Sequence, residues 1–173
     1  MITRVWVAVT VAFAASGCYF VGPDPEQVSL PLAFGARVTD GELQLWTGAP
    51  CPGVTRVTVR FSADAKLVLD PADGKRSELD HLDLDGPYPG WKVAQALPAN
   101  FDWSTAEQVD LWIDGGEGEG SKRALMADII NGSDQHPADT FWFQDVGWLN
   151  PAQVADLDGK IFLTVCTPDP GKP

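Results

Sequence analysis

Four aspartates are the residues of this sequence best suited to chemistry, because each has aromatic residues near it. Asp83 and Asp85 alternate within one run, and Asp110 and Asp114 flank Trp112 in another. Two carboxyl groups about 5 to 10 Å apart across a cleft can hydrolyse a glycosidic bond. Spacing in the sequence does not set that distance, so a glycan hydrolase is one hypothesis to test.

The run Asp80 to Gly86 also alternates carboxylates before a glycine, as EF-hand calcium loops do. With Gly86 at the sixth position, His81 takes the first ligand position and Lys92 the twelfth, which needs a bidentate Glu. The EF-hand interpretation therefore fails. We expect instead a strand over 82–85 with its leucines buried and its aspartates in water, the alternative being calcium in an irregular loop site.

Other motifs that fix a reaction are missing from the sequence. There is no Gly-x-Ser-x-Gly nucleophile motif, and the two histidines, His81 and His136, do not have the spacing of zinc ligands. The glycine-rich run 115–121 lacks the Gly-Lys-Ser/Thr ending of a phosphate-binding loop. We therefore expect no cofactor and no metal site.

Three tryptophans are out of phase with the regular apolar residues of their strands: Trp46, Trp112 and Trp142. Their neighbours on the same face are acids or amides. Trp46 shares its face with Glu42 and Gln44, Trp112 with Asp110 and Asp114, and Trp142 with Gln144. Indole rings beside carboxylates and amides are typical of surfaces that bind sugars or proteins. The alternative is a strand buried on both faces, or a bulge that shifts the alternation by one residue.

Strands must position these residues, because most of the chain alternates with period two and is interrupted by turn residues every eight to twelve positions. Arg56 to Phe61 is the clearest case, with Val57, Val59 and Phe61 on one face. The turn residues 48–53 separate this run from the preceding one. The pattern predicts about nine strands: 43–47, 56–61, 66–69, 82–85, 91–97, 109–113, 124–130, 141–143 and 161–165.

One segment near the C-terminus has helical signals. Asn150 can cap a helix, Pro151 suits the first turn, and Gly159 suits the end. The glycine-rich run 115–121 is predicted to be a flexible acidic loop between two hairpin partners. Together these features predict an all-β protein, an antiparallel β-sandwich with immunoglobulin-like or jelly-roll-like architecture, a barrel being a variant.

The N-terminus has the pattern of a secretory signal. Arg4 gives a short positive region, and residues 5–15 form an uncharged stretch too short to cross a bilayer. Ala15-Ser16-Gly17-Cys18 follows, and small residues directly before a cysteine resemble the lipobox of bacterial lipoprotein precursors. That family usually has Leu where Ala15 stands. The resemblance covers residues 1–18 and implies cleavage before Cys18 and a diacylglycerol anchor on its thiol.

Two other fates of this segment are alternatives. An ordinary secretory peptide cut after Gly17 would release a protein without an anchor, and an uncleaved segment would extend to Pro23. We expect the lipoprotein form, attached to the extracytoplasmic face of a bacterial cell membrane. The predicted organisation is a signal peptide over 1–17, a tether over 18–27, one β-sandwich domain over 28–168 and a tail over 169–173.

Cys51 and Cys166 are the cysteines that remain after Cys18, and an oxidising compartment allows them one pairing. Neither has a CxxC partner or a nearby histidine, so a structural disulfide is the prediction, with a redox or metal pair as the alternative. The bond would close a loop of 115 residues and restrict the unfolded chain by about 4 to 5 kcal/mol in the entropy model.

Composition limits the classes of partner. The 173 residues carry 24 acids and 12 bases, a formal net charge of −12, which becomes −13 once Arg4 is removed with the signal peptide. A chain this acidic, without a basic cluster in its sequence, is not expected to bind nucleic acid or an anionic lipid surface. Membrane attachment is therefore expected through acyl chains on Cys18.

Two functions from different classes fit these observations. The favoured one is a non-catalytic binding or accessory module of the cell envelope that holds a glycan or protein partner through its aromatic and acidic residues. The other is an envelope-glycan hydrolase that uses paired carboxylates. If Trp46, Trp112 and Trp142 are exposed without acids facing across a cleft, the binding module is favoured. If all three are buried, neither site remains.

Overall fold

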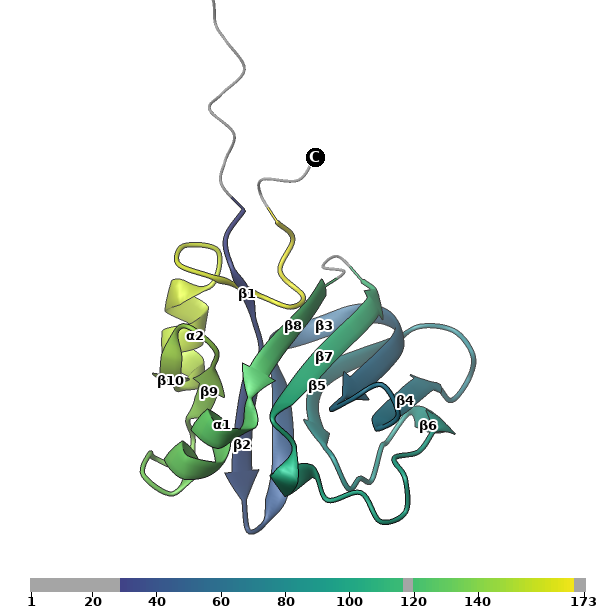
Figure 1. The fold of residues 1–173 in the computed structure, drawn as a ribbon. Coiled ribbons are helices and arrows are strands. Elements are labelled where there is room, and N and C mark those ends of the chain that lie inside the picture. Colours follow the sequence, from purple (N-terminus) through teal and green to yellow (C-terminus); the bar gives the residue numbers. More distant parts are fainter. Residues whose placement is uncertain (1–28, 117–119, 170–173) are drawn as a thin grey trace, which may run out of the picture.

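The computed structural model describes residues 29–116 and 120–169, which form eleven strands, two α-helices and one 3₁₀ turn (Figure 1). The strands of the first half are β1 (Leu32–Ala33), β2 (Gly35–Thr39), β3 (Glu42–Arg60), β4 (Lys66–Pro71), β5 (Ser77–Asp83) and β6 (Trp91–Gln95). The second half contains η1 (Trp103–Thr105), β7 (Gln108–Gly115), β8 (Gly120–Leu125), α1 (Met126–Ser133), β9 (Phe141–Phe143), β10 (Gly147–Leu149), α2 (Pro151–Leu157) and β11 (Leu163–Thr164).

The long strand β3 belongs to two layers of antiparallel sheet. Its first part pairs with β2 and β5, and β2 continues the layer to β9 and β10. Its last part, from Val54 to Arg60, pairs with β7 and β4, which extend that layer to β8 and β6. A strand that changes layers through bulges makes the corner of a sandwich. The prediction of an all-β, sandwich-like fold is confirmed.

The main core lies between these two layers. Alternate residues of β3, such as Leu43 and Leu45 in one layer and Val57 and Val59 in the other, are almost fully buried in one cluster. A second cluster covers the opposite face of the first part of β3, where Trp46 packs with residues of β9, α2 and the β1–β11 region. The first part of β3 is therefore covered on both faces.

The prediction of two separate strands on either side of residues 48–53 is wrong. Residues 48–53, expected to be a turn between two strands, are part of the single strand, which has register shifts on either side of Cys51. Gly48 and Gly53 have positive φ angles of 90° and 78°, and the prolines between them, Pro50 and Pro52, are exposed. Bulges absorb these residues without ending the strand.

A second correction concerns 124–130, predicted to be a strand. The strand β8 ends at Leu125, and α1 begins at Met126. The buried residues of α1 are Met126, Ile129 and Ser133, a helical spacing that competes with the period-two alternation over the same residues. Of the two helices in the described residues, only α2 has the capping signals that predict a helix from the sequence.

That other helix, α2, has the signals expected of it. The Asn150 side chain accepts a hydrogen bond from the backbone N–H of Gln153, and the Gln153 side chain accepts one from the backbone N–H of Asn150. Pro151 occupies the first turn, and Gly159 follows the end with a φ of 74°. The predicted hairpin is also present as β7 and β8, whereas residues 117–119 of its loop lie outside the described residues.

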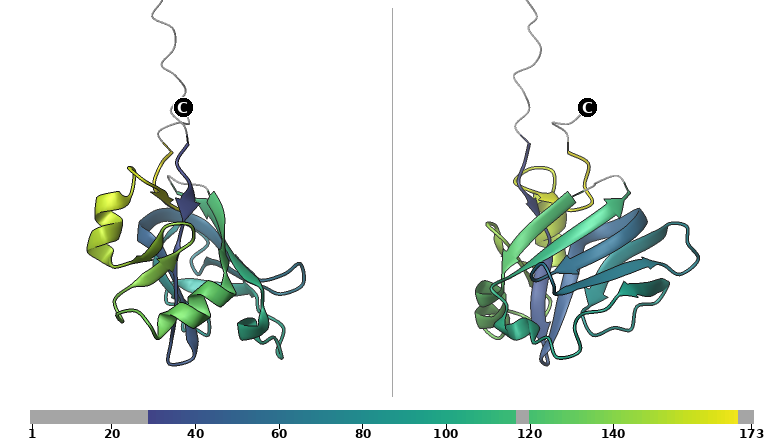
Figure 2. Two further views of the ribbon diagram at one scale, coloured as in Figure 1. Left: turned by 60° about the vertical axis from the view of Figure 1, so that its left-hand side comes forward. Right: turned by 45° about the vertical axis from the view of Figure 1, so that its right-hand side comes forward.

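The two ends of the described chain lie at the same end of the molecule (Figures 1 and 2). β1 pairs in parallel with β11, and the predicted disulfide between Cys51 and Cys166 joins the segment after β11 to β3. The predicted signal peptide and the whole predicted tether, which begins at Cys18, lie outside the described residues. Within the described part of the chain, no helix has the length and apolar character needed to span a membrane.

Candidate functional site

The best-formed site lies on the outer face of the layer that contains β7, the last part of β3, and β4. Three cross-strand rows make up this face. Trp112, Thr58 and Val68 form the middle row, with Asp110, Arg60 and Lys66 on one side and Asp114, Arg56 and Asp70 on the other. These side chains share a face because paired residues and every second residue of a strand point to the same side.

A shallow pocket of about 600 Å³ lies on this face, within the usual size range of small-molecule sites. It is lined by Arg56, Thr58, Arg60, Ala63, Lys66, Asp110, Trp112 and Asp114. Trp112 is 45% exposed, although the residues before and after it in β7, Leu111 and Ile113, are fully buried. An exposed indole in a polar pocket offers a flat apolar surface for stacking.

Arg60 contacts this indole directly. Its guanidinium carbon lies 5.9 Å from the centroid of the Trp112 ring, a cation–π distance. The same guanidinium donates from Nε and a terminal nitrogen to Oδ2 of Asp110, at 3.2 and 3.0 Å. Arg60 is therefore held in place from both sides, against the ring and against the carboxylate.

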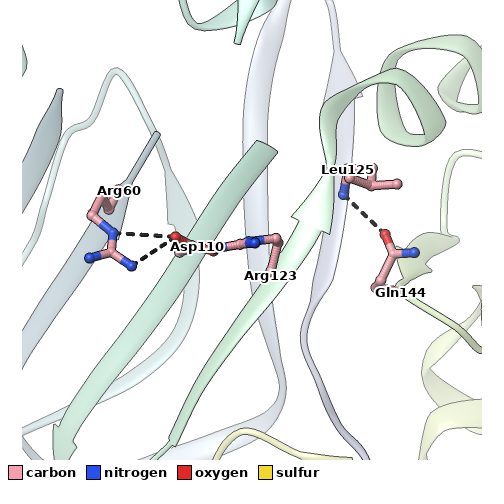
Figure 3. A network of polar contacts seen from close by, with 5 residues as sticks. All are labelled: Arg60, Asp110, Arg123, Leu125 and Gln144. Carbon is pink, nitrogen blue, oxygen red and sulfur yellow. Dashed lines mark hydrogen bonds and ion pairs between the residues drawn. The ribbon is translucent and has the colours of Figure 1, made fainter. Parts of the chain in front are cut away.

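Asp110 lies between two arginines from neighbouring strands, Arg60 of β3 and Arg123 of β8 (Figure 3). Arg123 Nε donates to Oδ1 of Asp110 at 2.9 Å, so each carboxylate oxygen accepts from a different guanidinium. Asp110 is 5% exposed, whereas both arginine side chains reach solvent. The buried carboxylate thus fixes two cations at the surface of the sheet.

The row on the other side of Trp112 contains a second ion pair. Arg56 Nε donates to Oδ1 of Asp70 at 2.8 Å, and a second guanidinium nitrogen reaches Oδ2 at 3.3 Å. This hydrogen bond lowers the pKa of the Asp70 carboxyl and raises the pKa of Arg56. Both groups therefore stay charged over the ordinary pH range.

Trp46 occupies a different environment, although its sequence signature matches that of Trp112. It is 5% exposed, its indole N–H donates to Asp80 Oδ1 at 2.9 Å, and its ring stacks on His81 at 5.6 Å. Phe141 and Phe143 contact it from β9. Trp46 offers no surface to a ligand. For this residue the alternative interpretation, a strand buried on both faces, is the correct one.

Trp142 is half-buried and lies apart from the Trp112 pocket. It packs against the main core, and its indole N–H donates to Gln144 Oε1 at 3.4 Å. Its ring centroid is 6.0 Å from that of Trp148, which in turn stacks on His136 at 4.6 Å. The three tryptophans singled out in the sequence therefore do not form one surface, and only Trp112 lines the pocket.

The four candidate aspartates are also divided. Asp110 and Asp114 line the Trp112 pocket, whereas Asp83 lines a second one of about 440 Å³ beside β5. Leu82 and Leu84 are buried as predicted and Asp85 is exposed, but Asp83 is half-buried. The strand predicted over 82–85 ends at Asp83, and residues 84–85 belong to the turn that follows β5. In the described ranges no group of three or more His, Cys, Asp or Glu residues could hold a metal ion.

The basic residues of the site are not among the candidates that the sequence pattern indicates. Arg56, Thr58 and Arg60 were assigned correctly to the outer face of their strand, but the partner strands of that face were unknown. Pairing with β7 and β4 brings Arg60 beside Asp110 and Lys66, residues 50 and 6 positions away. Only the strand order, which alternation does not specify, could have revealed this arrangement.

Comparison with known proteins identifies no relative of this chain. No family model, no curated protein and no solved structure matches the chain.

Proposed function

We propose that this chain is a lipid-anchored protein of the bacterial cell envelope that acts as a non-catalytic binding module and holds a saccharide on the Trp112 pocket. The observation that carries the proposal is the exposed indole of Trp112 at the centre of a polar pocket. Sugar rings stack their C–H faces on indoles, while charged and hydrogen-bonding groups beside the ring orient the hydroxyls.

The surroundings of the carboxylates favour binding over hydrolysis. A glycosidase needs one carboxyl group that can give a proton to the leaving oxygen. Asp110 is 5% exposed, and both of its carboxylate oxygens accept hydrogen bonds from guanidinium groups, so neither oxygen is presented to a leaving group. Asp83 belongs to another pocket, so it does not face Asp110 or Asp114 across a common cleft.

The anchor completes the proposal. Cys18 follows a signal-like segment and receives the lipid, and the segment 18–27 connects it to the folded domain. The domain begins and ends at one end of the molecule, so a single attachment point leaves the sheet faces free to meet a partner (Figure 2). The net charge of −13 after removal of the signal peptide keeps an anionic bilayer from competing for these faces.

A glycan array tests the binding function. The full-length protein, purified in detergent, should bind at least one class of envelope glycan, and Trp112→Ala should lose that binding. Ile161→Ala is the matched control, because Ile161 is another exposed apolar side chain, at 58%, outside the pocket. Binding that survives Trp112→Ala would contradict the saccharide site, and binding confined to an envelope protein would replace the glycan with a protein partner.

Fatty-acid labelling tests the anchor separately. Cells that express the wild type should incorporate labelled palmitate into the protein and retain it in the membrane fraction. Cys18→Ser should abolish both results, whereas Cys51→Ser should leave the label in place. Label on the Cys18→Ser protein would contradict the lipoprotein assignment without affecting the binding site.

A further inference from the structure

The charges around Trp112 are the reverse of those in the rest of the molecule. The whole chain has twice as many Asp and Glu as Lys and Arg, 24 against 12. The pocket around Trp112 has three cations, Arg56, Arg60 and Lys66, and only two carboxylates, Asp110 and Asp114. A local excess of positive charge on an acidic protein is a specific feature of this surface.

The excess is concentrated on one side of the indole. In the row of Asp110, the two arginines Arg60 and Arg123 share that single carboxylate, and Lys66 stands opposite Arg60 on β4. Lys66 makes no ion pair with any residue that the structure describes. This row therefore has three cations and one anion.

The opposite side of the indole has no such excess. There Arg56 is bound to Asp70, and Asp114 stands opposite Arg56 on β7. A carboxylate accepts hydrogen bonds from sugar hydroxyls, so Asp114 suits the neutral part of a ligand. The pocket thus has a cationic side, an aromatic centre and a hydrogen-bonding side.

We infer that the ligand of this pocket is an acidic saccharide that carries one anionic group per sugar ring. The ring stacks on Trp112, and its anionic group points to Arg60 and Lys66. Lys66 has no ion pair among the described residues, so one anionic group on the stacked ring can pair with it beside Arg60. This inference rests on the proposed function and specifies the substrate class of the same site.

The negative charge of the whole protein does not oppose this binding strongly. The Debye length is about 8 Å at physiological ionic strength, so a bound anion interacts mainly with the nearest charges. Lys66 and Arg60 are adjacent to the pocket, and the arginine is already held in place by Asp110. Hydrogen bonds from fixed guanidinium groups to a carboxylate or sulfate are among the stronger ones in proteins.

The test is calorimetric titration of the full-length protein in detergent with matched oligosaccharides. Tetragalacturonate supplies carboxylates, its fully methyl-esterified form has the same shape without charge, and a sulfated galactan tetrasaccharide supplies the other common anionic group. At least one anionic probe should bind about tenfold or more tightly than the ester, and its affinity should fall as salt rises. The probe that binds identifies the source of the anionic group.

Charge variants separate this inference from the proposed function. Lys66→Gln should lower the affinity for the anionic probe about five- to tenfold, because it removes one cation of the pocket. It should leave any affinity for the ester unchanged. Lys75→Gln is the matched control, since it removes the same charge from an exposed turn outside the pocket, and it should change the affinity less than about twofold.

Each result decides between the two claims. If neither anionic probe binds more tightly than the ester, or if Lys66→Gln leaves the affinity for the anionic probe unchanged, the acidic class is overturned. The proposed function then stands if a neutral glycan binds and Trp112→Ala abolishes that binding. If no saccharide, neutral or anionic, binds in a Trp112-dependent way, the proposed function and this inference both fail.

Discussion

Asp110 holds two arginines in fixed positions, and one of them, Arg60, lies against Trp112. Because the carboxylate is buried between β3 and β8, neither guanidinium has to be ordered when a ligand arrives. Side chains that are already immobilised lose little entropy on binding, which raises affinity without new contacts. At the scale of single residues, the site is therefore a rigid patch of sheet with an indole at its centre.

The two tryptophans with the same sequence signature should respond oppositely to truncation. Trp46→Ala removes a buried ring and should lower the free energy of unfolding by about 3 to 5 kcal/mol. Trp112→Ala removes an exposed ring and should change it by less than about 1 kcal/mol. Urea unfolding of both variants measures the difference. A large loss in Trp112→Ala would mean that this ring serves the fold.

The ion pair between Arg56 and Asp70 should give a small pH-dependent stability. The pKa of Asp70 is lowered in the folded protein by its hydrogen bond from Arg56, so its stabilisation is present above the ordinary pKa of Asp, near 4, and is lost as the pH falls below that value. Asp70→Asn should therefore unfold more easily than wild type at pH 7 and equally easily near pH 2. A difference that persists at pH 2 would assign the effect to packing.

At the scale of elements, β3 determines which tryptophan is covered. Period-two alternation correctly placed Val57, Val59 and Phe61 in the core and Arg56 and Arg60 outside. Alternation reports only which residues share a face. Whether a second layer covers the other face depends on strand order and on the bulges around Cys51, which come from long-range packing.

Helix α1 shows a conflict between local propensity and packing. Gly132 lies inside this helix, and replacing a helical glycine with alanine ordinarily stabilises by about 1 kcal/mol. A Cβ at Gly132 would lie 2.6 Å from the Trp148 indole, which is stacked on His136 and contacted by Arg37. Because the ring is held on several sides, it cannot move away easily. The cost of the clash should therefore exceed the gain in helix propensity.

We therefore expect Gly132→Ala to lower the free energy of unfolding by about 1 to 3 kcal/mol, in the range of other overpacked sites. Chemical denaturation measures the change. Combining the substitution with Trp148→Ala should remove the clash and restore the gain from helix propensity, relative to Trp148→Ala alone. A stabilised Gly132→Ala single variant would show that Trp148 moves aside.

At the scale of the whole molecule, the disulfide and the β1–β11 pair connect both ends of the described part of the chain to the central strand. Cys51 belongs to β3, and Cys166 follows β11, the parallel partner of β1. The Ser29 hydroxyl also donates to Asp169, which links the same two segments. The first and last described segments are thus both connected to the longest strand of the sheet.

Removing both cysteines of this bond should destabilise the protein substantially. The bond closes a loop across 115 residues, for which the entropy model gives about 4 to 5 kcal/mol and measured cases usually about 2 to 4. The Cys51→Ser/Cys166→Ser variant should therefore melt several degrees lower than wild type. Cys18→Ser is the control and should melt like wild type. An unchanged melting temperature in the double variant would show that the bond is not needed for stability.

The most direct test of the central claim is to find which tryptophan meets the ligand. The chain can be labelled with 5-fluorotryptophan, its fluorine resonances recorded by NMR, and the Trp112 resonance assigned by its loss in Trp112→Phe. Adding the glycan that binds best should shift the Trp112 resonance and leave that of buried Trp46 in place. A saturating titration that shifts the resonances of Trp91 or Trp142 and not that of Trp112 would contradict the account.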